Sequence, residues 1–313
     1  MMMKHETFVV QIEESGMRID KLLAIRFSSV SRERWQTQIK DGLVTVNGKK
    51  VAPSRKLQAG DRIDGEIPRE VVQEEPKPEQ VPVTVLYEDA WFAIVEKEAG
   101  VVVHPSFGHE TGTLVNALLA RFADRLSDAG EAHRPGIVHR LDKGTSGLLI
   151  VTLDNQAHVR LARAFRERTV ERYYDAIVHG VPDSEFGLID VPIGRAKVGR
   201  MRMEVRADGK QSQTRFEVVG SDGKTTHLNC RLITGRTHQI RVHLAYIGHP
   251  VIGDLLYGGH RAQGDDCDAL LLHASRIVFN HPITGEHIDV NCPLPERFQP
   301  FLQSFRSHLA RGR

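Results

Sequence analysis

Residues 69–82 constrain the fold more than any other stretch of the chain. They read REVVQEEPKPEQVP and contain three prolines and four glutamates with little periodic hydrophobicity. Proline fixes φ and has no backbone N–H to donate, so regular helices and sheets do not continue through such a segment. We therefore predict a solvated linker here, between a small N-terminal module (residues 1–68) and a large second domain (residues 83–313).

The N-terminal module has the pattern of two short helices followed by strands. Apolar residues recur at helical spacing in residues 18–27, and a second helix over residues 31–41 begins with a serine suited to its N-cap. Asn47-Gly48 lies between alternating hydrophobic residues and predicts a two-residue hairpin turn. Residues 62–67 predict a further short strand.

Positive charge is concentrated in this module. Residues 17–64 hold eleven Lys or Arg against five Asp or Glu, although the net charge of the whole chain is only +2. Concentrated positive charge suits a polyanion, because each neutralised phosphate releases condensed counterions. Positive charge alone is better explained by a solvated basic surface than by RNA binding. The order of the secondary-structure elements provides the further evidence.

The order helix, helix, hairpin resembles the small RNA-binding module of ribosomal protein S-four over about residues 17–67. The resemblance implies that RNA binds the basic helical face. The alternative is a generic small fold whose basic residues keep it in solution. The residues expected to contact RNA are Arg18, Lys21, Arg32, Arg34, Lys40, Lys49 and Lys50.

The large domain consists mainly of strand patterns with a few helices between them. Such runs predict an α+β fold with a largely antiparallel mixed sheet and flanking helices. Helices are expected at residues 113–122, 155–168 and 239–247, the second capped by Asp154. Strands are expected at residues 83–89, 91–105, 136–141, 147–153, 171–180, 200–206, 213–220, 226–235, 276–280 and 287–291.

The densest polar cluster among the apolar runs is HRLDKGTSG, residues 139–147. Its place between two expected strands puts Asp142 in a constrained turn at the end of a sheet, where catalytic groups are often presented. Aspartate and glycine are also ordinary turn residues. Considered alone, Asp142 is better explained as a turn former than as a catalyst.

Two further segments carry polar side chains suited to a cleft. Helical spacing places Arg241 on a face distinct from the apolar stripe of residues 239–247, where it can pair with a carboxylate and keep it ionised. An exposed helix arginine is the plainer interpretation of that residue alone. Alternation sends the rings of Tyr173 and Tyr174 to opposite faces, so that one packs in the core while the other can face a cleft and stack on a base.

Together these segments resemble the RluA/RluD-type pseudouridine synthases. The resemblance is carried by HRLDKGTSG, ERYYDAIVHG and GRTHQIRVHLAYIGHPVIGD, in the family's order, and covers nearly all of residues 83–302. It implies that Asp142 is the essential aspartate, Tyr174 the active-site tyrosine and Arg241 the arginine that pairs with the aspartate. It also implies that Arg140 helps to hold the opened RNA. One departure is Lys97-Glu98-Ala99-Gly100, where family members commonly have Lys-Pro-x-Gly.

The resemblance implies RNA as the partner, with large-subunit ribosomal RNA expected first. His104, Thr145, Arg236 and His238 are expected to contact the substrate around the cleft. Basic residues that could hold the RNA backbone while a uridine is extruded are Arg195, Lys197, Arg200 and Arg202.

The chemistry of the reaction and the composition limit the other partners. Breaking and remaking a glycosidic bond within one nucleotide exchanges no electrons or groups with a third molecule, so no cofactor is expected. The sequence has 16 histidines but contains neither a Cys-x-x-Cys nor a His-Glu-x-x-His motif, which argues against a metal site. No apolar run is long enough for a membrane span, and three scattered cysteines do not form a disulfide framework. We expect a cytoplasmic monomer.

Two other functions remain open from the sequence. A hydrolase acting on the N-glycosidic bond of RNA would also place a carboxylate at a sugar. A non-catalytic RNA-binding or ribosome-assembly factor would share the basic module but has no need of Asp142, Tyr174 and Arg241. The final proton acceptor also stays open between Tyr174 and a water molecule.

Overall fold

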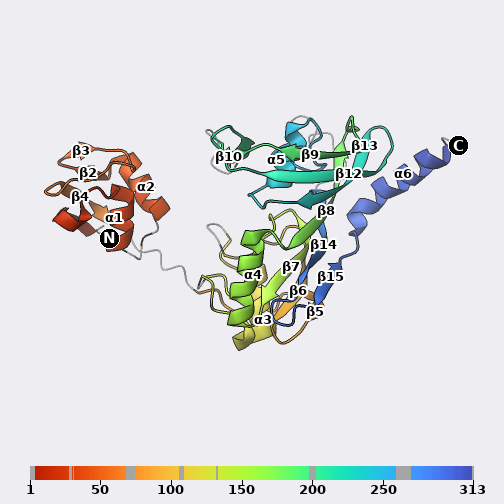
Figure 1. The fold of residues 1–313 in the computed structure, drawn as a ribbon, viewed down its shortest axis with the longest axis horizontal. Helices are drawn as coiled ribbons and strands as arrows, with labels where there is room; N and C mark the ends of the chain where they lie inside the picture. Colours follow the sequence, from red (N-terminus) through yellow and green to blue (C-terminus); the bar gives the residue numbers. More distant parts are fainter. Residues whose placement is uncertain are drawn as a thin grey trace. The chain divides into compact units, whose positions relative to one another are not determined.

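The computed structural model describes residues 4–27, 30, 32–67, 75–105, 109–131, 133–196, 202–258 and 269–311; side chains beyond residue 305 are not described. The chain divides into two compact units, Met1–Glu74 and Glu75–Arg313. Figure 1 shows the elements of each unit. Ser31, the expected N-cap of the second helix, lies outside the described residues.

The N-terminal unit is a four-stranded antiparallel sheet with two helices packed on it, around the fully buried Trp35 and Ile39. Asn47 and Gly48 both adopt positive φ, 51° and 72°, which the tight turn between β2 and β3 requires, so the predicted hairpin is confirmed. The first strand was not predicted from the sequence. The elements are β1 (Lys4–Val9), η1 (Ile12–Glu14), α1 (Ile19–Arg26), α2 (Arg32–Asp41), β2 (Val44–Val46), β3 (Lys49–Lys50) and β4 (Arg62–Ile67).

The second unit is built on a nine-stranded sheet in the order β5-β6-β7-β14-β8-β13-β12-β9, with β15 also paired to β14. Every pairing in it is antiparallel apart from β7 with β14, which confirms the predicted α+β class for the described residues. Its strands are β5 (Thr84–Glu88), β6 (Phe92–Lys97), β7 (Ser146–Thr152), β8 (Glu171–His179), β9 (Phe186–Asp190), β12 (Gln213–Ser221), β13 (Thr225–Leu232), β14 (Leu272–Asn280) and β15 (His287–Asn291). A separate hairpin joins β10 (Ile193–Arg195) and β11 (Met203–Val205).

The helices of this unit are amphipathic or capped as their sequences predict. Thr113 and Asn116 form a reciprocal capping box at the start of α3, and the Asp154 side chain accepts a 2.8 Å hydrogen bond from the backbone of Ala157 at the start of α4. The C-terminal helix α6 was not predicted. The helical segments are α3 (Leu114–Phe122), η2 (Ala123–Arg125), α4 (Asn155–Glu167), α5 (Gln239–Tyr246), η4 (Glu296–Phe298) and α6 (Gln299–Arg311).

Two strand predictions extended furthest into segments that are not strands. β6 ends at Lys97, and the valines that follow it continue without regular structure. Residues 136–141 form only one isolated bridge, from Ile137 to Val151, because the chain turns there toward the pocket instead of extending along β7. Hydrophobic alternation alone does not distinguish an apolar loop buried under a sheet from a strand within it.

The second half of the expected linker lies against the second unit. The Asn116 side chain donates a 2.8 Å hydrogen bond to the carbonyl of Lys77, and the backbone N–H of Glu79 donates one of 3.0 Å to the carbonyl of Asn116. The start of α3 thus holds residues 77–79, whose backbone groups find partners there instead of water.

Candidate active site

Asp142 lies in a turn whose backbone is held from several directions. The carbonyl of Asp142 accepts a 3.1 Å hydrogen bond from the N–H of Thr145, and the carbonyl of Lys143 accepts one of 2.8 Å from the N–H of Gly100. Leu141 is buried in the core beside it. Gly147 has φ 110°, and a Cβ there would lie 2.2 Å from the carbonyl oxygen of Ala274, so only glycine lets β7 meet β14 at the end of this turn.

A buried lysine supports the same turn from beneath. The ammonium of Lys97 donates to the carbonyls of Glu98 (2.7 Å), Val101 (2.8 Å) and Lys143 (3.2 Å), and its side chain is fully buried. Three carbonyl acceptors match the three N–H groups of an ammonium ion. Burial lowers the pKa of Lys97 to about 7, while the charge of Asp142 opposes the shift.

Arg241 connects Asp142 to a second carboxylate. Its Nη1 lies 3.3 Å from Oδ2 of Asp142, while its Nε and Nη2 each donate a 2.8 Å hydrogen bond to Asp254. The Asp254 side chain is 0% exposed and that of Asp142 is 20% exposed. Burial alone would lower the pKa of Arg241, but the hydrogen bonds and charges of Asp254 and Asp142 raise it above its ordinary value. Arg241 is therefore a permanently charged partner held in place by the buried Asp254.

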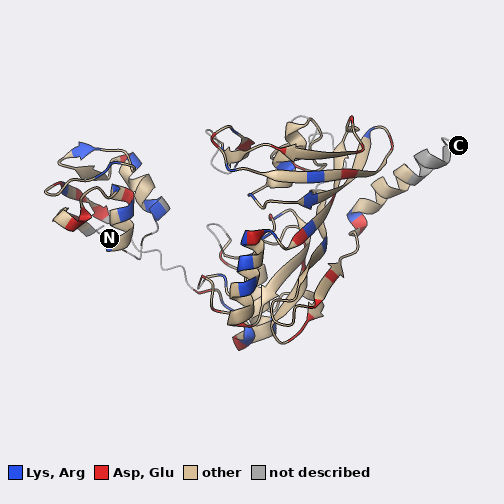
Figure 2. Ribbon diagram, viewed as in Figure 1, with Lys and Arg blue, Asp and Glu red and all other residues tan. Residues whose placement is uncertain are grey.

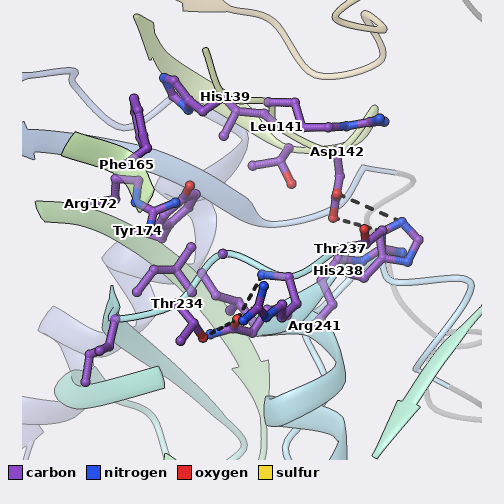
Figure 3. Close-up of a pocket in the computed structure, with 18 of the residues that line it drawn as sticks. His139, Leu141, Asp142, Phe165, Arg172, Tyr174, Thr234, Thr237, His238 and Arg241 are labelled. Carbon is purple, nitrogen blue, oxygen red and sulfur yellow. Dashed lines mark hydrogen bonds and ion pairs between the residues drawn. The ribbon is translucent and has the colours of Figure 1, made fainter. Parts of the chain in front are cut away.

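His238 and Tyr257 complete the surroundings of Asp142. Nε2 of His238 lies 3.9 Å from Oδ1 of Asp142, and its Nδ1 lies 2.8 Å from the hydroxyl of Tyr257. His238 adopts φ 55° at the start of α5, a left-handed conformation that turns its ring toward the carboxylate (Figure 3). Burial lowers the pKa of His238, with Asp142 opposing the shift.

Tyr174 is both a core residue and part of the pocket wall. It lies on β8, is only 6% exposed, and packs with Ala176 and Leu141 in the main hydrophobic core. Burial raises the pKa of its phenol, and the nearby Asp142 raises it further, while Arg172 opposes the shift. Tyr174 is therefore a neutral phenol near pH 7. Tyr173 points to the other face of the sheet, where its hydroxyl donates to Glu171.

These residues surround a pocket of about 490 Å³, within the size range of small-ligand sites. Figure 3 shows Phe165, Arg172 and Tyr174 at one end and Asp142, Thr237 and His238 at the other. Among the described residues, the pocket wall includes a single carboxylate, Asp142, and six arginines, which come from the segment before β7, the end of α4, β8 and the start of α5. The arginines are Arg140, Arg166, Arg168, Arg172, Arg236 and Arg241.

Seven residues expected from the sequence at the substrate site line this pocket, and one does not. His104 is buried outside its wall, with its pKa lowered to about 4 by burial and by the nearby Arg140. His139 is in the wall, where its Nε2 accepts the backbone N–H of Ile150 and its ring stacks on Phe165. The seven that line the pocket are Arg140, Asp142, Thr145, Tyr174, Arg236, His238 and Arg241.

The basic residues expected to bind RNA elsewhere have varied surroundings. Arg18 and Arg32 both pair with the buried Asp20, so their guanidinium groups are already engaged. Arg195 ends β10, and Arg202 lies over the ring of Tyr257, 5.6 Å from its centroid. Lys197 and Arg200 lie outside the described residues. Lys21, Lys40, Lys49 and Lys50 are exposed, and Arg34 is half-buried.

The sequence interpretation missed several residues of the site. Asp254 ends the third motif and follows Gly253, yet nothing in its spacing indicated that it would hold Arg241. Arg166, Arg168 and Phe165 lie at the end of α4, where arginines at intervals of two or three residues are typical of a solvated helix face. Only the fold, which places the ring of Phe165 against His139, brings them to the pocket.

Other kinds of site are not formed by the described part of the chain. No three His, Cys, Asp or Glu residues within it are grouped so that they could hold a metal ion. None of its helices is long and apolar enough to cross a membrane. Cys230 and Cys292 are buried free thiols, and Cys267 lies outside the described residues.

Comparison with known proteins agrees with this geometry. Residues 92–246 match the RNA pseudouridylate synthase family, and residues 17–63 match the S4 domain. The RNA pseudouridine synthase YlyB of Bacillus subtilis is 43% identical over 95% of this chain and 96% of its own length. The chain belongs to the RluA-type family of RNA pseudouridine synthases, isomerases that here carry an N-terminal S4 domain.

Two further proteins are similar to most of this chain. The ribosomal large subunit pseudouridine synthase D of Zymomonas mobilis is 38% identical over 95% of this chain and 96% of its own length. The solved structure of human RNA pseudouridylate synthase domain containing 1 superposes with a TM-score of 0.56 at 26% identity, covering 73% of this chain and 96% of the human chain. The α+β arrangement of the second unit is thus shared with a solved member of the family.

Proposed function

We propose that this enzyme converts specific uridines of large-subunit ribosomal RNA to pseudouridine, with Asp142 as the catalytic carboxylate. The observation that carries the proposal is a partly exposed carboxylate, the single one among the described residues of an arginine-lined pocket, held beside the fixed charge of Arg241. Relatives named for the ribosomal large subunit, 38–39% identical over nearly the whole chain, support this choice of RNA. We expect the enzyme to act in the cytoplasm.

The reaction breaks the C1′–N1 bond of uridine and forms a C1′–C5 bond after the uracil has turned. N1 gains a proton and C5 loses one, so the atoms of the nucleotide are conserved. Cleavage develops positive charge at the sugar, which an ionised carboxylate stabilises or attacks directly. The Asp142 side chain is 20% exposed and lines the pocket, and Arg241 holds the direction of its carboxylate through the 3.3 Å contact with Oδ2.

Tyr174 is suited to holding the detached base. Its ring forms part of the pocket wall on the same side as Phe165. Because its pKa is raised by burial and by Asp142, the phenol keeps its proton and serves better as a packing surface than as a base. A water molecule at the open side of the pocket is then the better candidate for removing the proton from C5.

A base in a stacked RNA helix cannot reach Asp142, so the target uridine must leave its stack. The arginines of the pocket wall offer charge-assisted hydrogen bonds to the phosphates of the extruded nucleotide. The S4 domain supplies a second RNA contact, through the exposed Lys21 and Lys40 of its helices. Figure 2 shows the basic residues of both units.

The test is to map pseudouridines at single-nucleotide resolution in ribosomal RNA from cells that lack the gene and cells that carry it. Restoring the wild-type gene should restore the missing modifications, and Asp142→Asn should not. Purified Asp142→Asn should lose at least about 10³-fold in rate, as removal of a central catalytic group does in other enzymes. Asp124→Asn, which alters an exposed carboxylate outside the pocket wall, is the matched control.

The outcomes separate the alternatives. Release of free uracil without pseudouridine in the RNA would identify a hydrolase. Equal RNA binding by wild type and Asp142→Asn, with no modification by either, would identify a binding factor. Full activity of Asp142→Asn would refute the assignment of the carboxylate, and modified sites confined to transfer or messenger RNA would refute the choice of ribosomal RNA.

A further inference from the structure

The pocket has far more positive charge than its one carboxylate can balance. Of its six arginines, only Arg241 has a carboxylate partner among the described residues. Buried or half-buried cations are normally paired, because an unpaired charge loses its hydration without compensation. The remaining arginines therefore mark places where a negative group of the substrate is expected.

Arg172 is the clearest of these places. It lies on β8, two residues before Tyr174, and its Nε is buried without a hydrogen-bond partner among the described residues. Burial lowers the pKa of its guanidinium, whereas the similarly enclosed Arg241 has its pKa raised by its two carboxylates. The two arginines line one pocket, and in the part of the chain that the structure describes only Arg241 has a counter-ion.

Packing alone does not account for Arg172. Its guanidinium lies over the ring of Phe165, 5.5 Å from the centroid, and a Cβ on Gly235 would come within 2.8 Å of Nη1. A leucine or methionine could fill this space without desolvating a charge. The contacts with Phe165 and Gly235 instead fix the plane of the guanidinium, which favours bidentate binding of a phosphate.

Arg168 supports the same end of the pocket. It follows α4 and adopts φ 64°, the left-handed conformation in which glycine or asparagine is usual. The end of α4 accounts for this conformation, and an arginine there, instead of glycine or asparagine, adds a charged side chain to the pocket wall. Arg168 is exposed and has no ion-pair partner among the described residues, so its charge is free to meet an anion.

We propose that Arg172 and Arg168 form a phosphate-binding subsite, which holds a phosphodiester group next to the reacting uridine at the end of the pocket away from Asp142. This inference rests on the proposed function for the identity of the nucleoside. Tyr174, proposed above to hold the base, lies at the same end of the pocket as Arg172, so the side chains contact different parts of the nucleotide. Asp142 and Arg241 act on the sugar, while Arg172 and Arg168 fix the backbone to which that sugar belongs.

The test uses uridine 3′,5′-bisphosphate, which carries the nucleoside with both flanking phosphates, and uridine itself as the uncharged reference. Binding to the full-length protein is measured by ligand-observed NMR, with the two phosphorus resonances reporting which phosphate is bound. Wild type should bind the bisphosphate more tightly than uridine. Arg172→Gln should weaken bisphosphate binding about tenfold, since it removes charge-assisted hydrogen bonds, and should leave uridine binding unchanged.

Three further variants separate charge from folding. Arg168→Asn suits the left-handed backbone, so it should fold at least as well as wild type while weakening bisphosphate binding about threefold. Gly235→Ala keeps every charge but displaces the Arg172 guanidinium. It should therefore weaken bisphosphate binding as Arg172→Gln does. Arg163→Gln is the matched control. Arg163 lies on α4, the helix that precedes Arg168, is outside the pocket wall and pairs with Glu167.

Several results would overturn the subsite. The first is equal binding of uridine and the bisphosphate by wild type. The second is unchanged bisphosphate binding in both Arg172→Gln and Arg168→Asn. A third is an equal loss of uridine and bisphosphate binding in Arg172→Gln, which would mean that Arg172 only shapes the pocket. Because the readout is binding, the subsite would stand if the expected losses occurred in a protein that made no pseudouridine, and the proposed function alone would fail.

Discussion

Two aspartates, one in each unit, pair with arginines but differ in exposure and in the number of hydrogen bonds that they accept. Asp20 in the N-terminal unit is 0% exposed and accepts five hydrogen bonds, two each from Arg18 and Arg32 and one from Gln36. Asp142 in the pocket is 20% exposed and accepts one side-chain hydrogen bond, of 3.3 Å, from Arg241. The first carboxylate has all its acceptor sites occupied, and the second keeps most of its sites open.

The difference shows how one ion pair can serve structure and another chemistry. A saturated carboxylate ties together the residues that surround it and has nothing left to offer a ligand. A catalytic carboxylate must be held in one orientation while its oxygens remain available for the transition state. In this enzyme the two requirements are met by giving Arg241 a second carboxylate, Asp254, which accepts its best hydrogen bonds.

After the removal of the Asp142 charge itself, the largest effect on rate is expected when the open carboxylate is moved without loss of charge. Asp142→Glu extends the side chain by one methylene, and a misplacement of roughly 1 Å relative to the sugar costs on the order of 10²-fold in rate. Single-turnover kinetics on the target RNA should show this loss with unchanged RNA affinity. A rate within a factor of about two of wild type would mean that only the charge of Asp142 matters.

A smaller effect is expected when the support of Arg241 is weakened. Asp254→Asn keeps the volume but removes one acceptor oxygen, so Arg241 should lose hydrogen bonds and its fixed position beside Asp142. We expect about a tenfold fall in kcat and a loss of about 2 kcal/mol in the free energy of unfolding, since hydrogen bonds to charged groups are involved. Kinetics and denaturant unfolding measure the two effects.

The control for this variant is Asp289→Asn. Asp289 forms a similar two-pronged pair with Arg276, but both side chains are partly exposed. Surface pairs of this kind contribute less than about 1 kcal/mol, so activity and stability should change little. If Asp254→Asn left kcat at the wild-type value, Arg241 would not need its second carboxylate to serve Asp142.

Local signals predicted much of the fold. The hairpin at Asn47-Gly48 and the cap at Asp154 were recognisable because their geometry is set by a few adjacent residues. The same reasoning failed for residues 136–141, where an apolar segment runs under the sheet without joining it. It also gave no indication of β1, whose partner β4 lies more than fifty residues away.

The site could be predicted only in part, because the residues that form it are far apart in the sequence. Asp142 and Arg241 are 99 positions apart, and only the resemblance to a family suggested that they meet. The role of Asp254 and the arrival of Arg168 and Arg172 at one cavity depend on how α4, β8 and α5 pack. Interactions of that range have no periodicity or turn chemistry in the sequence to reveal them.

The smallest effect on activity is expected for a substitution of Asp20, the saturated aspartate. Its effect should be confined to stability. Asp20→Asn should leave the rate at saturating RNA unchanged and lower the stability of the N-terminal unit by about 2 kcal/mol, because two arginines lose a charged acceptor. Trp35 reports on this unit alone in a Trp91→Phe background, since the chain has two tryptophans. Asp41→Asn, an exposed carboxylate on the neighbouring helix, should have little effect.

The pH dependence sharpens this last prediction. Burial alone would raise the pKa of Asp20, but the hydrogen bonds from Arg18, Arg32 and Gln36 hold it well below its ordinary value. A lowered pKa in the folded state means that the stabilisation is complete above about pH 5 and is lost as pH falls below about 4. The stability difference between wild type and Asp20→Asn should therefore shrink as pH is lowered from about 6 to about 3. A difference that stayed constant over that range would show that Asp20 acts through its shape and not through its charge.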